Sequence, residues 1–245
     1  MTSTFLLVRE DREYLRAPGE ELQTDLGVLT VPEDVEPGQR LETHLGEEFV
    51  VREPRGPDLF DHFERTGAPM MPRDIGLVIG MTGAAADDRV LDAGTGTGVL
   101  AAYLGRIGAA VRTYEQDPEF ADVARENMRL AGVADRVDVR TGDVTAELDA
   151  LAAERGFDLL TLDTADAPSV VRRAPELLRS GGFVVVYSPF VEGTRTAAEA
   201  AEEAGLTDVV THETIQRRMQ FDERGSRPDT RGVGHTGYLT VGRLS

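Results

Sequence analysis

The hydrophobic and polar positions in the first part of the chain follow the short period that is typical of β-strands. Runs in which apolar residues alternate with polar ones are separated by turns that contain glycine. The runs lie at residues 5–8, 26–31, 40–43 and 48–52. Short alternating runs with glycine turns between them predict a twisted antiparallel unit. We therefore expect residues 1–56 to form a small N-terminal β domain.

The second part, residues 57–245, begins with a different pattern. Pro54-Arg55-Gly56-Pro57 interrupts the strands, and an amphipathic stretch over residues 58–82 follows it. Apolar residues at the spacing of a helix predict helical structure. Residues 57–86 are therefore interpreted as a helical lead-in to the larger domain.

Strand and helix patterns alternate after residue 86. Strand-like runs lie at residues 90–92, 111–115, 137–141, 157–163 and 183–188, and the segments between them have helical spacing, as at residues 118–131. Such alternation indicates βαβ units and a parallel sheet. In the tail, residues 209–219 and 238–243 are strand-like, with a loop and no helix between them. The predicted fold is α/β, a doubly wound Rossmann-like domain with a terminal antiparallel strand pair.

A glycine-rich turn follows the first of these strands. Glycines between a strand and a helix let the backbone approach a ligand closely. A dinucleotide site would need a further glycine at Val99, and it would place Asp92 beside an anionic pyrophosphate. A cationic sulfonium with an amino-acid tail suits an acidic strand end better, so we predict a site for S-adenosylmethionine. Its residues are Asp92, Gly94, Thr95, Gly96, Thr97, Gly98 and Val99.

Acidic residues also close the next two strands. Glu115, with Gln116 beside it, is expected to bind the cofactor's ribose, because a carboxylate at this strand end can accept both hydroxyls. Asp143 and Val144 follow the third strand, where an aspartate can accept a hydrogen bond from an adenine amino group. An N-cap for the helix that starts near Thr145 is an equally good role for Asp143.

Asp163 ends the fourth strand. Ligands of open α/β sheets bind outside the carboxyl ends of the strands, so Asp163 is expected to contact the cofactor and face the methyl donor. If the acceptor is an adenine, this carboxylate can accept from the exocyclic amine and hold N1 in line with the methyl group. Helix capping is the alternative role, because Asp166 and Pro168 have the pattern of a helix start.

Composition limits the chemistry further. The 245 residues include no cysteine, which excludes disulfides, thiolate metal sites and cysteine nucleophiles, and we expect no bound metal. No stretch is apolar for long enough to span a membrane, and the first residues lack the pattern of a signal peptide. A cytoplasmic enzyme is the expectation.

The charge of the chain is strongly negative. There are 44 acidic residues against 26 basic ones, all of them arginine, and the net charge is −18. At ordinary salt this charge argues against a nucleic-acid partner. In concentrated salt the same argument loses its force, because the Debye length falls to about 3 Å at 1 M. An acidic chain without lysine indicates a halophilic source.

Several motifs together resemble those of one family. They are Pro72-Arg73-Asp74, the glycine-rich turn, Tyr114-Glu115, Leu162-Asp163, Arg227-Pro228 and His235-Thr236-Gly237-Tyr238. With the N-terminal β domain, this combination resembles the tRNA (adenine-N1)-methyltransferase family over nearly the whole chain. That family methylates an adenine in the T-loop of tRNA.

The resemblance implies S-adenosylmethionine as cofactor, S-adenosylhomocysteine as product, tRNA as partner, a homotetramer, and a target base flipped into the site. It implies Glu115 and Asp143 on the cofactor and Asp163 as the catalytic group that orients the acceptor. We interpret His235 as a hydrogen-bonding anchor rather than a general base, because N1 of adenine is already nucleophilic. Five arginines within residues 217–231 stand out from the acidic background. The expected tRNA-binding residues are Arg217, Arg218, Arg227, His235 and Tyr238.

The chain departs from the family's pattern at two places. Ala68 and Met71 stand where the family's Gln-x-x-Tyr-Pro-Lys-Asp has glutamine and tyrosine. The Pro-Trp step that the family has after Asp163 is also missing, with one extra residue in its place. Two alternative functions stay open: a protein-L-isoaspartate-type carboxyl methyltransferase, which shares a similar cofactor half, and an RNA scaffold that binds S-adenosylmethionine with weak catalysis.

The charge generates a first prediction. Raising KCl to about 1 M should raise the midpoint of thermal unfolding, because salt at that concentration screens the repulsion among the carboxylates. Melts followed by circular dichroism from low to molar KCl measure the effect. Loss of structure on addition of salt would contradict the halophilic interpretation.

Overall fold

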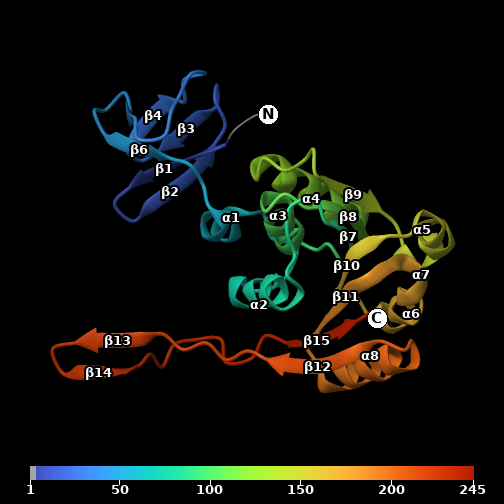
Figure 1. Cartoon of the computed structure of the whole chain (residues 1–245). Coiled ribbons are helices and arrows are strands. Elements are labelled where there is room, and N and C mark those ends of the chain that lie inside the picture. The colour runs from blue at the N-terminus through green and yellow to red at the C-terminus, as the bar shows by residue number, and fades with distance from the viewer. Residues whose placement is uncertain (1–3) are drawn as a thin grey trace.

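The N-terminal part of the chain forms two small antiparallel sheets. The computed structural model describes residues 4–245, and Figure 1 shows this part as the blue unit beside the larger sheet. Strands β2, β1, β6 and β5 form one sheet in that order, and β3 and β4 form a hairpin. The strands are β1 (Phe5–Arg9), β2 (Arg12–Arg16), β3 (Glu21–Thr24), β4 (Gly27–Thr30), β5 (Arg40–Glu42) and β6 (Glu48–Arg52). The antiparallel unit is as predicted, while β2 and β3 were not predicted.

Strand β1 joins this unit to the rest of the molecule. Phe5 and Leu7 are buried in the core of the N-terminal unit, whereas Leu6 and Val8 belong to a core that continues into the larger domain. Both faces of β1 are therefore covered. The alternation predicted for residues 5–8 is therefore wrong: the run is continuously apolar, as expected for a strand that is buried on both faces.

The connecting region contains two helices rather than one continuous amphipathic element. Helix α1 spans Gly56–His62 and α2 spans Pro72–Thr82. Residues 63–71 between them are not helical. Gly67 and Pro69 disfavour helix there, and Pro72 occupies the first turn of α2, where its missing N–H costs nothing.

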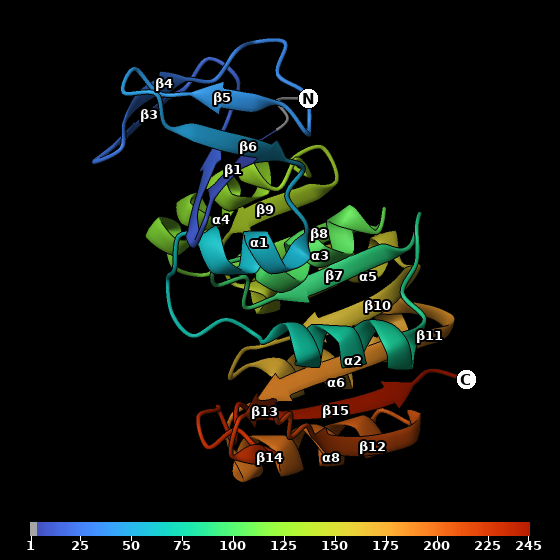
Figure 2. The ribbon, with the colours of Figure 1, turned by 90° about the vertical axis from the view of Figure 1, so that its left-hand side faces the viewer.

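The larger domain is built on one seven-stranded sheet. Its order is β12-β15-β11-β10-β7-β8-β9, and Figure 2 shows these strands one below another, beneath the N-terminal unit. Its first five strands in chain order are β7 (Arg89–Ala93), β8 (Ala110–Glu115), β9 (Val137–Thr141), β10 (Phe157–Leu162) and β11 (Leu178–Ser188). These five strands run parallel to one another, which confirms the predicted parallel sheet.

Helices cover both faces of this sheet. They are α3 (Val99–Arg106), α4 (Pro118–Leu130), the 3-10 turn η1 (Val144–Glu147), α5 (Leu148–Glu154), α6 (Ala167–Arg172), α7 (Ala174–Leu177) and α8 (Val191–Glu203). Neighbouring residues of β7 point to opposite faces: Val90 packs in the core that includes α3 and α4, and Leu91 in the core that includes α6 and α8. The doubly wound prediction is confirmed.

The order of the sheet places a crevice at one edge. The chain runs outward from β7 to β8 and β9, and then returns to β10 on the other side of β7. The connections after β7 and β10 therefore leave in opposite directions. Ligands of such folds bind at this reversal, outside the carboxyl ends of the strands.

The C-terminal strands are antiparallel, as predicted. Strand β15 (Tyr238–Arg243) pairs with β11 on one side and with β12 (Thr207–Glu213) on the other. The intervening loop holds an unpredicted hairpin of β13 (Met219–Asp222) and β14 (Gly225–Pro228). Residues 214–237, here called the arm, project away from the body in Figure 1.

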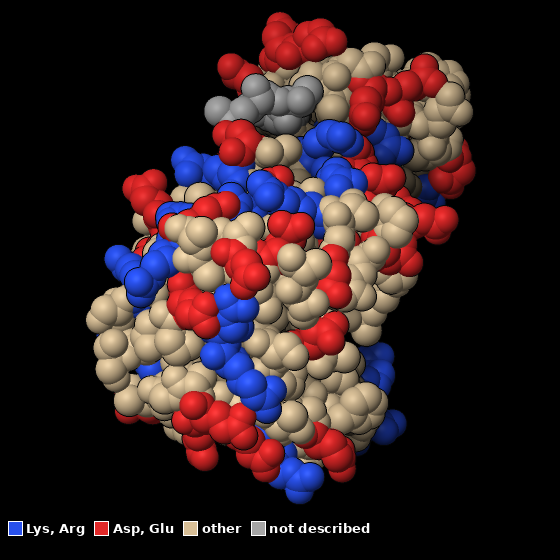
Figure 3. Space-filling view, turned by 90° about the vertical axis from the view of Figure 1, so that its right-hand side faces the viewer, with Lys and Arg blue, Asp and Glu red and all other residues tan. Residues whose placement is uncertain are grey.

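Most of the body's arginines are paired with carboxylates. Figure 3 shows basic and acidic side chains interspersed over one face of the molecule. Near the β9 edge, Arg112 pairs with Glu154 at 2.8 Å and Arg140 with Asp138 at 2.8 Å. Within residues 4–245, no helix is long and apolar enough to cross a membrane. Three or more carboxylate or imidazole groups placed to hold a metal are likewise not found in this range.

Candidate active site

The glycine-rich turn is shaped by glycines at positions that other residues would strain. Gly94, Gly96 and Gly98 have φ angles of 86°, 52° and 81°, which L-residues with a side chain rarely adopt. At Gly94 a Cβ would lie 2.0 Å from the carbonyl oxygen of Asp163. The backbone of the turn is thus pressed against the end of β10, with room for hydrogen only.

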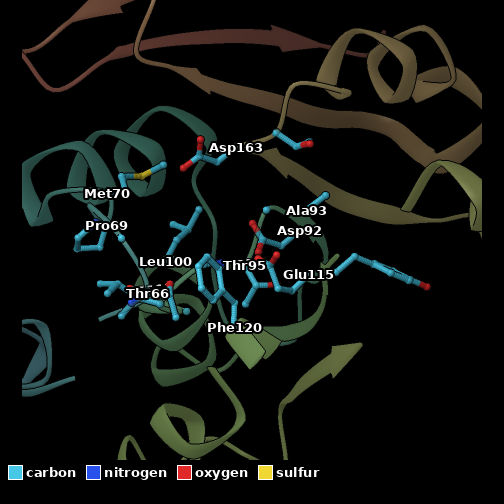
Figure 4. A pocket seen from close by; sticks show the side chains of 18 of the residues that line it. Thr66, Pro69, Met70, Asp92, Ala93, Thr95, Leu100, Glu115, Phe120 and Asp163 are labelled. Carbon is cyan, nitrogen blue, oxygen red and sulfur yellow. Dashed lines mark hydrogen bonds between the residues drawn. The ribbon is translucent and has the colours of Figure 1, made fainter. Parts of the chain in front are cut away.

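Glu115 supports the same turn from the end of β8. One carboxylate oxygen accepts a hydrogen bond from the amide of Gly96 at 2.9 Å, and the other accepts from the amide of Asp117 at 3.1 Å. The carboxylate therefore stands beside the turn at the wall of the cavity, on the side opposite Thr66 in Figure 4.

Asp92 lies beneath the turn and is buried. Its two carboxylate oxygens accept hydrogen bonds from the hydroxyls of Thr113 and Thr161, each at 2.5 Å. These threonines are its neighbours on the two flanking strands. Burial raises the pKa of Asp92, and the hydroxyl donors partly oppose that shift.

Asp163 follows the last residue of β10 and points into the cavity (Figure 4). Its amide donates to the carbonyl of Ala93 at 2.8 Å, which fixes the backbone beside the glycine-rich turn. The side chain is accessible from the cavity, yet protein atoms surround it on most sides. This enclosure, with the nearby charges of Asp92 and Glu115, raises the pKa of Asp163 to about 7.

Together these elements enclose a cavity of about 310 Å³. The part of the chain that the structure describes contributes three carboxylates to its lining and no arginine or histidine. A cation is favoured there over an anion. The residues fit S-adenosylmethionine, whose sulfonium is positive and whose adenosine needs close approach to glycine backbone.

The structure brings most of the predicted cofactor residues together. The lining includes Asp92, Gly94, Thr95, Gly96, Thr97, Gly98, Val99, Glu115, Gln116, Val144 and Asp163. Asp143 is not among them, although its two neighbours are. Its carboxylate accepts from the amide and hydroxyl of Thr145 at 2.8 and 2.7 Å, so it caps η1, the alternative role considered above.

The predicted tRNA-binding residues lie outside the cavity. Arg217, Arg218 and Arg227 are in the arm, and all three are exposed. His235 sits at the base of the arm, where its ring nitrogens contact the carbonyl of Pro189 at 2.9 Å and a carboxylate oxygen of Glu213 at 2.8 Å. Both partners accept hydrogen bonds, and they raise the pKa of His235. The Tyr238 ring packs against the imidazole, with centroids 4.9 Å apart.

Several residues of the site were missed at the sequence level. Thr66, Gly67, Pro69 and Met70 line the cavity from the segment between α1 and α2, and Phe120 lines it from the first turn of α4. No motif within this segment indicates a contact with the cavity. Its departure from the family's pattern at Ala68 and Met71 made such a contact still harder to predict. A glycine followed by two prolines was the available signal for a non-helical segment.

Tyr187, which lies near the end of β11 and beside Asp163, was also not predicted from the sequence. Its half-buried ring lies against the backbone of Gly237, where a Cβ would be 2.5 Å from the ring. Burial raises the pKa of Tyr187, and Asp74 and Asp163 add to the shift. Gly237 in the tail was the sequence signal for this close contact.

The fold and the site define a class. A doubly wound sheet with a glycine-rich turn, a carboxylate at the end of the next strand and an anionic cavity at the reversal is a Rossmann-like S-adenosylmethionine-dependent methyltransferase. A family model described as the tRNA methyltransferase complex GCD14 subunit matches residues 64–225. The chain belongs to this tRNA methyltransferase family.

Relatives and solved structures agree with this assignment. The tRNA (adenine(57)-N(1)/adenine(58)-N(1))-methyltransferase TrmI of Methanocaldococcus jannaschii is 34% identical, over 96% of this chain and 92% of the relative. A tRNA (adenine(58)-N(1))-methyltransferase TrmI of Thermus thermophilus is 30% identical, over 84% and 80%.

Among solved structures, a SAM-dependent O-methyltransferase from Thermotoga maritima has a TM-score of 0.80 at 25% identity, over 99% of this chain and 93% of the other. The tRNA (m1A58) methyltransferase TrmI from Aquifex aeolicus has a TM-score of 0.72 at 23% identity, over 99% and 96%. At this identity the second likeness supports the fold.

The packing of the turn generates a prediction for Gly94. Gly94→Ala should destabilise the protein by roughly 3 kcal/mol more than Gly132→Ala and weaken cofactor binding. Both glycines have positive φ, but a Cβ at Gly132 meets nothing within 4 Å, so the control isolates the contact with Asp163. Urea unfolding and calorimetric titration with S-adenosylmethionine measure the two effects. Equal losses in the two variants would show that the contact is unimportant.

Proposed function

We propose that this enzyme methylates N1 of an adenine in the T-loop of tRNA, at position 58 or 57, with the base flipped into the cavity. Membership of the tRNA methyltransferase family supports the substrate class, and two TrmI relatives are named for these adenines. The cofactor supplies an electrophilic methyl group. The cavity's own residues then have to position the acceptor and handle one proton.

The placement of Asp163 carries this proposal. Its carboxylate lies at the cavity wall beside the glycine-rich turn, where it can accept a hydrogen bond from the exocyclic amine of adenine. That bond orients N1 toward the methyl donor. When N1 gains the methyl group the ring becomes positive, and loss of the amine proton neutralises it. A carboxyl group with a pKa of about 7 is suited to accept that proton.

The arm supplies the proposed contact with tRNA. Arg217, Arg218, Arg224 and Arg227 are exposed, and among residues 4–245 none of them has an ion-pair partner, unlike Arg231 with Asp229. Unpaired guanidinium groups are good ligands for phosphate. With His235 and Tyr238 at its base, the arm is proposed to guide the T-loop toward the cavity.

The arm also supports the proposed homotetramer. Its exposed apolar side chains include Ile215 and Phe221, which are 62% and 76% accessible. A two-stranded hairpin is marginally stable when it stands alone. Packing against other subunits would cover these residues. A cytoplasmic location and a halophilic source complete the proposal.

Methyl transfer from radiolabelled S-adenosylmethionine to unmodified tRNA at molar KCl, followed by nucleoside analysis, tests the function. We expect 1-methyladenosine in the T-loop, and Asp163→Ala should abolish it while cofactor binding remains.

Replacing Arg217, Arg218 and Arg227 by glutamine should raise KM for tRNA about tenfold or more, because each phosphate contact adds affinity.

Two results would contradict the proposal. Cofactor binding without labelled tRNA would favour the scaffold or the protein-carboxylate alternative, and the latter is then tested with an isoaspartyl peptide. Transfer to tRNA at a different atom would overturn the adenine-N1 assignment while leaving the family intact.

The raised pKa of Asp163 predicts a distinct pH dependence. Only the ionised carboxylate accepts from the amine, so kcat/KM should fall about tenfold per pH unit below about pH 7. At saturating cofactor the midpoint should move to lower pH, because a nearby cation favours the ionised form. Asp163→Asn should lose most activity and this acid limb. A wild-type profile that is flat from pH 6 to 8 would remove Asp163 from the proton-handling role.

A further inference from the structure

The segment that connects α1 to α2 forms one wall of the cavity. Residues 64–70, here called the strap, connect the end of α1 to the start of α2 and supply one wall. In Figure 4, Thr66, Pro69 and Met70 lie on the side opposite Glu115. A ligand in the cavity would thus lie between the strap and the strand ends.

Asn127 clamps the beginning of this strap. Its side-chain amide donates to the carbonyl of Glu64 at 3.0 Å and to the carbonyl of Thr97 at 2.9 Å. Its side-chain oxygen accepts from the amide of Glu64 at 3.2 Å. One side chain therefore binds both backbone groups of Glu64 and joins them to the glycine-rich turn.

A second contact reinforces the clamp. The amide of Thr66 donates to the hydroxyl of Thr97 at 3.3 Å. Beyond Thr66 no hydrogen bond is found for residues 67–70 within the described chain, and the next anchor is Met71, whose carbonyl accepts from the amides of Asp74 and Ile75. The strap is fixed at its two ends, while its middle lines the cavity.

Burying the side-chain amide of Asn127 costs free energy unless its polar atoms have hydrogen-bond partners. The side chain is 0% exposed, on the face of α4 that also buries Ala124 and Met128 in the apolar core. A polar group there is costly to bury without partners, and a leucine of similar size would pack without that cost. The partners it has are all backbone groups of the strap and the turn.

We propose that Asn127 is a positioning residue for S-adenosylmethionine, which holds the strap against the glycine-rich turn so that the cavity wall is formed before the cofactor binds. A wall that is already ordered binds its ligand without the cost of ordering it. The inference depends on the cofactor site and not on the proposed tRNA substrate, so an error in the substrate leaves it testable.

Asn127→Leu tests the clamp, because it removes the three hydrogen bonds and keeps the number and branching of the side-chain heavy atoms. Calorimetric titration should show cofactor affinity weakened about tenfold, since two or three hydrogen bonds of ordinary strength no longer hold the wall. The value of kcat at saturating cofactor should stay within about twofold, with the loss appearing in KM for the cofactor. Amide hydrogen exchange at Glu64 and Thr66 should become faster.

Leu206→Ala is the matched control for lost stability, because Leu206 is buried just after the end of α8, in the core on the other face of the sheet. It should lower the melting temperature without changing cofactor affinity. If Asn127→Leu fails to fold, Asn127→Ala removes the same three hydrogen bonds without adding apolar volume and should give the same pattern. Unchanged affinity and exchange in a folded Asn127→Leu protein, with only a lower melting temperature, would show a purely structural role and overturn the inference.

Discussion

The site depends on the contact between the glycine-rich turn and the end of β10. Gly94 lies so close to the carbonyl of Asp163 that a Cβ would be 2.0 Å away, and the Asp163 amide bonds to the carbonyl of Ala93 at 2.8 Å. These contacts join two strand ends that are distant in sequence. They fix the backbone that carries the proposed acceptor-binding carboxylate relative to the turn, and methyl transfer between two bound molecules requires such precise positioning.

Electrostatics follows from the same geometry. Asp92, Glu115 and Asp163 meet at neighbouring strand ends, and repulsion between carboxylates is one cause of the raised pKa of Asp163. A bound cation offsets this repulsion and favours the ionised carboxylate. In the role proposed for Asp163, the carboxylate accepts a hydrogen bond from an amine only when it is ionised, so the positive charge of a bound cofactor would support that role. In the proposed reaction this positive charge passes to the base, so the repulsion between the carboxylates returns only after the product and its proton have left the cavity.

The periodicity of the chain predicted the parts whose local pattern and tertiary environment agree. The parallel strands are short apolar runs between amphipathic helices, and the Gly94–Gly98 turn has a motif of its own. Strands β2 and β3 were not predicted because only Leu15 and Leu22 in them are buried, so apolar and polar residues do not clearly alternate along them. The hairpin of β13 and β14 has exposed residues on both faces, so burial requires neither face to be apolar.

The sequence predicted the residues that line the cavity from the strand ends, but not those that line it from the strap. Strand ends carry motifs because their residues meet the ligand in a fixed order, whereas the strap lines the cavity through contacts set by tertiary structure. Asn127 shows the limit clearly: in the sequence it is one polar residue in an amphipathic helix, and its partners Glu64 and Thr97 lie far upstream, before and after α2. Asp143 shows the opposite case, since two roles were equally consistent with its position and the side chain caps η1.

The distribution of charge bears on how an acidic protein can bind a polyanion. In the body, carboxylates lie beside most arginines, whereas the arm contains five arginines against three carboxylates. At about 1 M salt, attraction between charges is screened beyond about 3 Å, so net charge neither repels nor steers tRNA from a distance. Under those conditions only groups in direct contact contribute, and guanidinium groups gain from paired hydrogen bonds to phosphate. In the proposed function, the unpaired arginines of the projecting arm supply these direct contacts, and the acidic body does not prevent them.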